Sequence, residues 1–392
     1  MTEPTSAIVE DAKQAALAVL LNNARDGRGG LPRTAAWGYP EPYTRDLLIG
    51  ALGTLVSGNE ELVASLRRVL EALAHNQSPL GHIPSLVDMP EDRGASDTTP
   101  LFLIALGMYQ RFTNEPEFLA SAAQRAHLWL CYQSPEDKVI LTQDPTSDWR
   151  DEQWVEGSGL FVNALLYCHL SLSGDTQRLA MLEHHLHRLD VRRTGQSHVH
   201  ERLVSPDAPY YALWSYKDAS SERFDLLGNG IAILSGMASP ERAGQIVDWV
   251  ERECQALAAQ GQLAVALPPN LFPYIRPEDP DWRPRYAHYN PPGCYHNGGL
   301  WPFVCGFWVS ALVAAGRYEL AREKLLVLTE LVRPTRVVTK EFGFNEWLNA
   351  QDGTPRGQDW QSWSAAMYLY AAECVAREST PFFEIMRAAA RR

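Results

Sequence analysis

The chain has 392 residues, of which 45% are hydrophobic, so it can bury a large core. Its net charge of −12 argues against a nucleic acid or an anionic membrane as a partner, because no basic patch offsets the acidic field. The six cysteines are scattered without a Cys-x-x-Cys pair, which argues against a disulfide framework or a zinc ribbon.

The amino terminus carries neither the basic nor the apolar region of a signal peptide. No stretch approaches the roughly 20 uninterrupted apolar residues that a membrane span requires. We therefore expect a soluble, cytoplasmic protein that has no membrane partner.

Helical periodicity runs through most of the chain and starts with an amphipathic helix at 6–24. From residue 47, apolar and amphipathic helices alternate in pairs: 47–56 and 60–75, 98–112 and 116–132, 156–172 and 175–190, 226–237 and 240–259, 298–315 and 317–332, then a last apolar helix at 361–376 and a short tail helix from 380. Helices that are apolar all round are buried, whereas those with one charged face lie outside. The pattern predicts inner and outer helices in about six pairs.

Long loops all lead from an outer helix into an inner one: 27–44, 77–97, 134–155, 191–225, 260–297 and 333–360. The repeat length varies too much for a regular open array. We therefore predict an all-α fold, an (α/α)6 barrel of six inner and six outer helices. Its active site should lie at one rim, where the loops converge, and one domain should span residues 1–392.

Polar and aromatic residues cluster just before the inner helices. The stretch 144–154 interleaves four acidic residues with two tryptophans and an arginine. Sugar sites need this mixture of flat apolar faces and carboxylates. Helix capping is the competing interpretation for Asp46, Asp97 and Asp225, because a helix N-terminus favours a carboxylate. Core packing is the competing interpretation for the tryptophans.

Other chemistries lack their signatures. No His-Glu-x-x-His or Cys-x-x-Cys pattern indicates a metal, and neither a Gly-x-Ser-x-Gly turn nor a phosphate-binding glycine loop is present, so we predict no metal and no cofactor. Paired carboxylates remain. An inverting glycosidase needs an acid and a base on opposite sides of the sugar, ~6.5–9.5 Å apart. One carboxylate should come from the middle of the chain and the other from near its end.

Six segments occur in the order of motifs in a known family: Tyr43-Thr44-Arg45-Asp46, Asp151 ahead of 162–167, 223–230, 295–302, Phe344-Asn345-Glu346-Trp347 and Gln361-Ser362-Trp363-Ser364. Over about residues 43–376 the chain resembles the alkaline/neutral invertases, (α/α)6-barrel glycoside hydrolases that cleave sucrose. The segments 297–302 and 361–364 also resemble related α-glucosidases and debranching-type enzymes.

The resemblance implies roles for named residues. Asp151 would be the catalytic acid and Glu346 the catalytic base. The residues expected to contact substrate are Tyr43, Arg45, Asp46, Asp148, Trp149, Asp225, His296, Asn297, Trp301, Gln361 and Trp363.

Two departures from the family pattern bear on these roles. Glu152 and Gln153 follow Asp151 where the family has two arginines, and the spacing to the next helix differs by about one residue, which leaves Asp148 as a rival acid. Asn345 replaces the proline before the family's catalytic glutamate, which leaves a leaving group other than fructose open.

The sequence thus predicts an inverting exo-glycosidase that hydrolyses a small α-glucoside, with sucrose as the first candidate. An α-glucosidase or a glycosylglycerate hydrolase on the same scaffold is the alternative. An epimerase or isomerase of the N-acylglucosamine type, also an (α/α)6 barrel, is the alternative of another class. The expected partner is a saccharide, and a homo-oligomer stays open.

Overall fold

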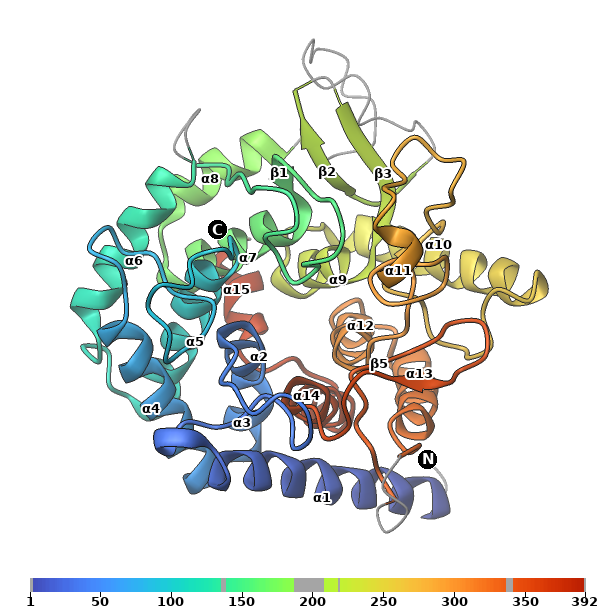
Figure 1. The fold of residues 1–392 in the computed structure, drawn as a ribbon, viewed down its shortest axis with the longest axis horizontal. Helices are drawn as coiled ribbons and strands as arrows, with labels where there is room; N and C mark the ends of the chain where they lie inside the picture. The colour runs from blue at the N-terminus through green and yellow to red at the C-terminus, as the bar shows by residue number, and fades with distance from the viewer. Residues whose placement is uncertain (1–2, 135–138, 187–207, 218, 336–340, 391–392) are drawn as a thin grey trace.

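The fold is known from a computed structural model, which describes residues 3–134, 139–186, 208–217, 219–335 and 341–390 (Figure 1). The end of the predicted helix 175–190 and parts of three predicted loops lie outside these residues. Across the described chain, no helix is both long and apolar enough to cross a membrane.

An inner ring of helices surrounds the centre of the molecule in Figure 1. Its members are α2 (Thr44–Ile49) with α3 (Ala51–Ser57), α5 (Thr98–Thr113), α7 (Leu160–Ser173), α9 (Leu226–Ser235), α12 (Pro302–Ala314) and α14 (Ser362–Arg377). Each helix contacts the next, and α14 contacts both α12 and α3. The ring is therefore closed.

Outer helices pack around this ring: α1 (Glu3–Arg25), α4 (Glu60–His75), α6 (Ala120–Tyr132), α8 (Thr176–His185), α10 (Pro240–Ala259) and α13 (Tyr318–Leu331). The two kinds of helix bury different surfaces. Every residue of α12 up to Val313 is buried, whereas α4 buries one stripe that includes Leu62, Leu66 and Val69. The predicted all-α (α/α)6 barrel is confirmed.

Helix α14 approaches its two neighbours closely because both offer a glycine. A Cβ on Gly53 of α3 would lie 2.1 Å from the carbonyl oxygen of Ala366, and one on Gly306 of α12 would lie 2.7 Å from that of Met367. The helix α15 (Phe383–Ala390) contacts α7 and α9, and Arg387 donates to the carbonyl of Leu234 near the end of α9. It thus lies at the end of the barrel opposite the start of the inner helices.

Several short strands lie at the rim, and the sequence pattern did not predict them. A four-stranded antiparallel sheet has the order β1 (Ser158–Gly159), β2 (Ala212–Tyr216), β3 (Ala219–Asp225) and β4 (Leu271–Phe272). A second pair joins β5 (Trp347–Leu348) to β6 (Pro355–Arg356), and the loop before α12 contains the short helix α11 (Tyr286–Tyr289). Strand β3 ends where α9 begins, so the sheet fixes the entrance of that inner helix.

Candidate active site

A cavity of about 330 Å³ opens at the rim where the inner helices begin. It is lined by residues of five of the six loops predicted to converge there, together with the first residues of the helices that follow: Thr34, Tyr39, Tyr43, Arg45, Asp46, Ser85, Asp92, Gly94, Ala95, Thr98, Thr146, Ser147, Trp149, Asp151, Tyr295, His296, Trp301, Glu346, Gln361 and Trp363. Ten of the thirteen residues predicted for the site are therefore in its wall.

Asp151 stands in the turn that follows Trp149. Its side chain is 62% exposed, and its Oδ1 lies 3.9 Å from Nε2 of His296. Asp151 is part of the cavity wall. Partial burial raises the pKa of this carboxyl, Arg45 lowers it, and the neighbouring charges of Glu152 and Asp148 raise it further. A carboxyl with a raised pKa is suited to hold a proton for transfer.

Asp148, the rival acid, is placed differently. Its side chain is fully buried, and its Oδ2 lies 2.7 Å from a guanidinium nitrogen of Arg150. Burial by itself would raise its pKa, but the charge and hydrogen bonds of Arg150 hold the pKa of Asp148 below its usual value. This carboxylate stays ionised and does not line the cavity, so the geometry favours Asp151 as the acid.

Glu346 reaches the cavity from the segment that leads into strand β5. Its side chain is 5% exposed, and its Oε2 accepts a hydrogen bond of 3.0 Å from the backbone N–H of Gln358. A Cβ on Gly357 would lie 2.1 Å from the same oxygen. Gly357, at φ +68°, therefore provides the space in which this carboxylate sits.

Aromatic rings form much of the cavity wall around His296. Its imidazole packs against the rings of both Tyr295 and Trp301, whose centroids lie 4.0 and 5.2 Å from its own and 5.1 Å from each other. Burial and the charge of Arg150 keep the pKa of His296 well below its usual value, so the ring is neutral.

Several wall residues carry a buried polar atom that has no hydrogen-bond partner among the described residues. They are Nδ1 of His296, Nε1 of Trp149, Nε1 of Trp363 and Oε1 of Gln361. Buried polar groups normally have partners. Hydroxyl groups of a bound sugar could supply them.

Arg45 and Asp46 form the α2 side of the cavity. The Arg45 guanidinium makes two bonds to Asp97, of 2.6 and 3.1 Å. Asp46 is 6% exposed, and burial, only partly offset by Arg45, raises its pKa to about 8. Near neutral pH, Asp46 can therefore donate a hydrogen bond as a neutral acid.

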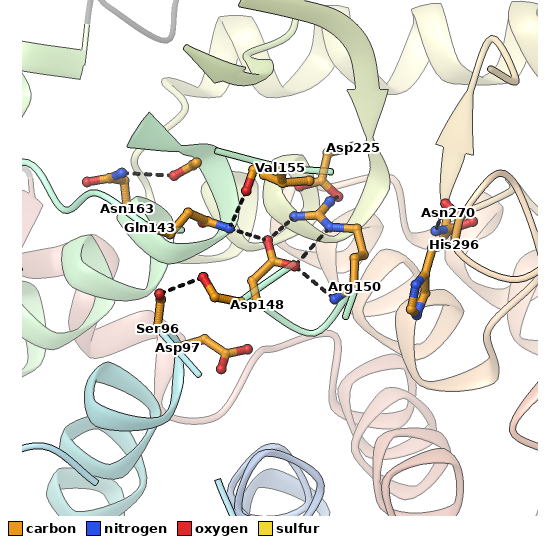
Figure 2. Close-up of polar contacts among 12 residues, drawn as sticks. Ser96, Asp97, Gln143, Asp148, Arg150, Val155, Asn163, Asp225, Asn270 and His296 are labelled. Carbon is orange, nitrogen blue, oxygen red and sulfur yellow. Dashed lines mark hydrogen bonds and ion pairs between the residues drawn. The ribbon is translucent and has the colours of Figure 1, made fainter. Parts of the chain in front are cut away.

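Three residues predicted to contact substrate do not line the cavity. Asn297 bonds through both side-chain atoms to the backbone of Ile275 and also donates to the carbonyl of Asn290. Asp148 and Asp225 are both buried against Arg150 (Figure 2). All three hold loops in place.

Asp97 and Asp225 were also open to a capping interpretation. Both occupy the residue before an inner helix, but neither side chain makes a capping hydrogen bond. Their carboxylates turn to arginines instead.

Sequence reasoning missed several wall residues. Tyr39 belongs to a long loop that was predicted to reach the rim, yet no motif marked it. Tyr295 is part of a quoted motif, and its φ of +44° is rare for a residue with a side chain. For both tyrosines burial raises the pKa first, and the charges of Asp151 and Glu346 add to it, which places both rings near the two carboxylates.

Within the described ranges, no group of three or more His, Cys, Asp or Glu side chains is arranged to hold a metal ion.

Comparison with known sequences extends the resemblance. Residues 215–378 match the family model described as alkaline and neutral invertase. Cytosolic invertase 1 of Oryza sativa subsp. japonica is 32% identical over 158 residues, which are 38% of this chain and 25% of that enzyme. Probable alkaline/neutral invertase D of Arabidopsis thaliana is 30% identical over 159 residues, 38% of this chain and 26% of that protein. The matched part thus spans about a quarter of these relatives.

Solved structures share the fold over nearly the whole chain. The GH63 mannosylglycerate hydrolase from Thermus thermophilus superposes with a TM-score of 0.64 at 16% identity, covering 91% of this chain and 99% of that one. A protein named as a wild-type glycosidase gives a TM-score of 0.62 at 14% identity, covering 96% and 99%. The predicted resemblance is confirmed: residues 215–378 carry the sequence pattern of the alkaline and neutral invertase family, within a helical barrel that known glycosidases share.

Proposed function

We propose that the protein is an inverting glycoside hydrolase that acts on a small α-glucoside, with sucrose as the first candidate substrate. One observation carries the proposal. Asp151 and Glu346 are about 200 residues apart in sequence, yet both line the same cavity among aromatic rings. The match to the invertase family over residues 215–378 supports the same activity.

In this mechanism the two carboxyl groups work in one step. Asp151 gives its proton to the glycosidic oxygen as the bond from that oxygen to the anomeric carbon breaks. Glu346 takes a proton from a water molecule, whose oxygen bonds to the anomeric carbon from the opposite face. The sugar leaves with its anomeric configuration inverted.

The size of the cavity supports a small substrate. A volume of about 330 Å³ is at the lower end of the ~300–1,000 Å³ that is common for small-molecule sites. A mono- or disaccharide-sized ligand suits this space better than a polymer. The aromatic wall offers faces for sugar rings, and the unpaired polar atoms offer hydrogen bonds to hydroxyl groups.

The charged groups of the cavity wall do not favour the glycosylglycerate alternative, in which the leaving group carries a carboxylate. Among the described residues of the cavity wall, Arg45 is the one guanidinium or ammonium group, and it is already paired with Asp97. The carboxyl groups in the wall belong to Asp46, Asp92, Asp151 and Glu346. A leaving group with its own carboxylate would therefore meet no unpaired cation among these described wall residues. The charge balance therefore supports an uncharged glycoside.

The epimerase alternative depends on histidines that move protons on an open-chain sugar. His296 is the one histidine in the described part of the wall, and it is buried and neutral. The carboxylate pair supports hydrolysis better.

The cytoplasmic location stays a prediction. One relative is named as cytosolic, while others are named as mitochondrial or chloroplastic.

A substrate panel tests the proposal. The purified chain is incubated with sucrose, maltose, trehalose, isomaltose and glucosylglycerate, and released glucose is measured. We expect release from sucrose. Release from maltose alone would indicate an α-glucosidase, and release from glucosylglycerate alone would indicate a glycosylglycerate hydrolase. Release from none of the five would contradict a glucoside hydrolase and favour the epimerase alternative.

A further inference from the structure

A buried arginine directly precedes the proposed acid in the sequence. Arg150 is 0% exposed, and its guanidinium lies between two carboxylates of equally buried residues. It is 2.7 Å from Oδ2 of Asp148 and 3.0 Å from Oδ1 of Asp225 (Figure 2). No ion pair joins Arg150 to Asp151 in the described part of the chain. Arg150, the cation next to Asp151 in the sequence, is thus paired with two other carboxylates.

The triad of Asp148, Arg150 and Asp225 ties two rim segments together. Asp148 and Arg150 belong to the turn that carries Asp151, and Oδ1 of Asp148 accepts from the backbone N–H of Arg150 at 2.8 Å. Asp225 comes from the junction of β3 and α9. A Cβ on Gly228 would lie 2.5 Å from Oδ2 of Asp225, so a glycine leaves room for this carboxylate.

The geometry of this triad points to a role in the proposed reaction. We propose that Asp225 is a positioning residue: together with Asp148 it holds the Arg150 guanidinium away from Asp151 and fixes the turn that presents the acid to the cavity. The inference rests on the proposed function, because it assigns Asp225 a purpose only if Asp151 must deliver a proton.

The charges around Asp151 show why the position of Arg150 matters. The ionisable groups that act on Asp151, or that it acts on, come from α2 and the loops around it: Tyr39, Tyr43, Arg45, Asp46, Asp148, Glu152, Tyr295 and His296. Arg45 is the cation among them; it is paired with Asp97 and still lowers the pKa of Asp151. An additional unpaired guanidinium within about 4–6 Å would keep Asp151 ionised.

Loss of Asp225 should therefore change the pH dependence of hydrolysis. The acid must be protonated, so kcat/KM falls as the pH rises through the pKa of Asp151. In Asp225→Asn, the freed side of Arg150 can turn to Asp151 and lower that pKa. We expect the alkaline limb of the pH profile to move down by about one to three units, with kcat affected more than KM.

A matched control separates this effect from lost stability. Glu251→Gln breaks another ion pair, 2.8 Å from Nζ of the buried Lys324, on the outer helices α10 and α13. It should lower the melting temperature while leaving the pH profile unchanged. The double variant Arg150→Gln/Asp225→Asn lacks the guanidinium, so its alkaline limb should return to the wild-type pH even if kcat stays low.

The experiment compares these variants on the glycoside that the wild type hydrolyses, with circular dichroism to check folding. An alkaline limb at the wild-type pH in folded Asp225→Asn would overturn the inference. If that variant does not fold, Gly228→Ala displaces the carboxylate without removing it, and the same shift is expected there.

Hydrogen exchange gives a readout that needs no turnover. Asp225→Asn should speed amide exchange in peptides covering 144–157 more than Glu251→Gln does, because the turn loses its anchor. Equal exchange in the two variants would overturn the positioning role. If the wild type hydrolyses no glycoside, the proposed function is contradicted. The hydrogen-exchange result then still tests whether Asp225 holds the turn at 144–157 in place.

Discussion

Asp151 and Glu346 reach the cavity from different surroundings. Asp151 lies in a turn at the cavity wall, where burial and then the neighbouring charges of Glu152 and Asp148 raise its pKa. Glu346 is nearly buried and accepts a backbone N–H of Gln358. The difference matches the two roles of a proton donor and a base.

Substitution of the two carboxyl groups should stop turnover while the fold persists. We expect Asp151→Asn and Glu346→Gln each to reduce kcat by about 10²–10⁴-fold, the usual contribution of acid–base catalysis. Steady-state kinetics and circular dichroism measure the two properties.

Asp148→Asn should behave differently from Asp151→Asn. It leaves the buried Arg150 one partner short, so it should lower the free energy of unfolding by about 3–5 kcal/mol. A stable, inactive Asp148→Asn beside an active Asp151→Asn would show that Asp148 is the acid.

Asp46 should make stability depend on pH. Its folded pKa of about 8 lies above the ~3.9 of an unfolded aspartate. The folded state therefore holds a proton that the unfolded state releases, and the stability contributed by this group is lost as the pH rises through about 8. Asp46→Asn removes that titration. Its melting temperature should fall less than the wild-type value between pH 6 and pH 9, and an equal fall in both proteins would contradict a neutral Asp46.

At the scale of the element, turns at the rim hold the carboxyl groups proposed to be catalytic. The segment before α14 holds Glu346 through a backbone hydrogen bond and through the space beside Gly357. Phe344 and Trp360 near it have φ values of +42° and +55°. Such conformations are costly and persist where the surrounding structure imposes them.

Two glycines with the same φ test this packing. Gly357 and Gly261 are both at φ +68°, but a Cβ on Gly261 would meet no atom within 4 Å. Gly261→Ala should therefore cost about 1–2 kcal/mol of stability and no activity. Gly357→Ala should also displace the Glu346 carboxylate and reduce kcat/KM by at least about 100-fold, since small misplacements of catalytic groups are costly. Equal activity in the two variants would show that Glu346 is not held in this way.

The helices could be predicted because the spacing of apolar residues along the sequence shows which face of each helix is buried. The predicted 60–75 and 240–259 coincide with α4 and α10. Strands β2 and β3 were missed since they are short rim segments whose burial does not alternate regularly. Asp148 and Asp151 share one turn, and spacing alone could not tell which carboxylate faces the cavity and which faces Arg150.

At the scale of the whole molecule, the closed ring joins both ends of the chain. Asn23 of α1 donates to the carbonyl of Trp360 and to the hydroxyl of Ser362, so the first helix holds the loop into the last inner one. One large cluster of buried apolar residues includes members of every inner helix. We therefore propose that residues 1–392 form one domain.

Ring closure predicts cooperative unfolding. Gly53→Val should push α3 away from α14, because even a Cβ there would meet the backbone of Ala366. We expect calorimetry to give one transition for the wild type and one at a lower temperature for the variant. Two separate transitions in the wild type would contradict a single domain.

The central claim is that one carboxyl group donates a proton while the other activates water on the opposite face of the sugar. Proton NMR of the first glucose released from sucrose tests this directly, because it distinguishes the anomers before they interconvert. Prompt formation of β-glucose is the predicted result. Prompt formation of α-glucose would contradict the mechanism assigned to Asp151 and Glu346.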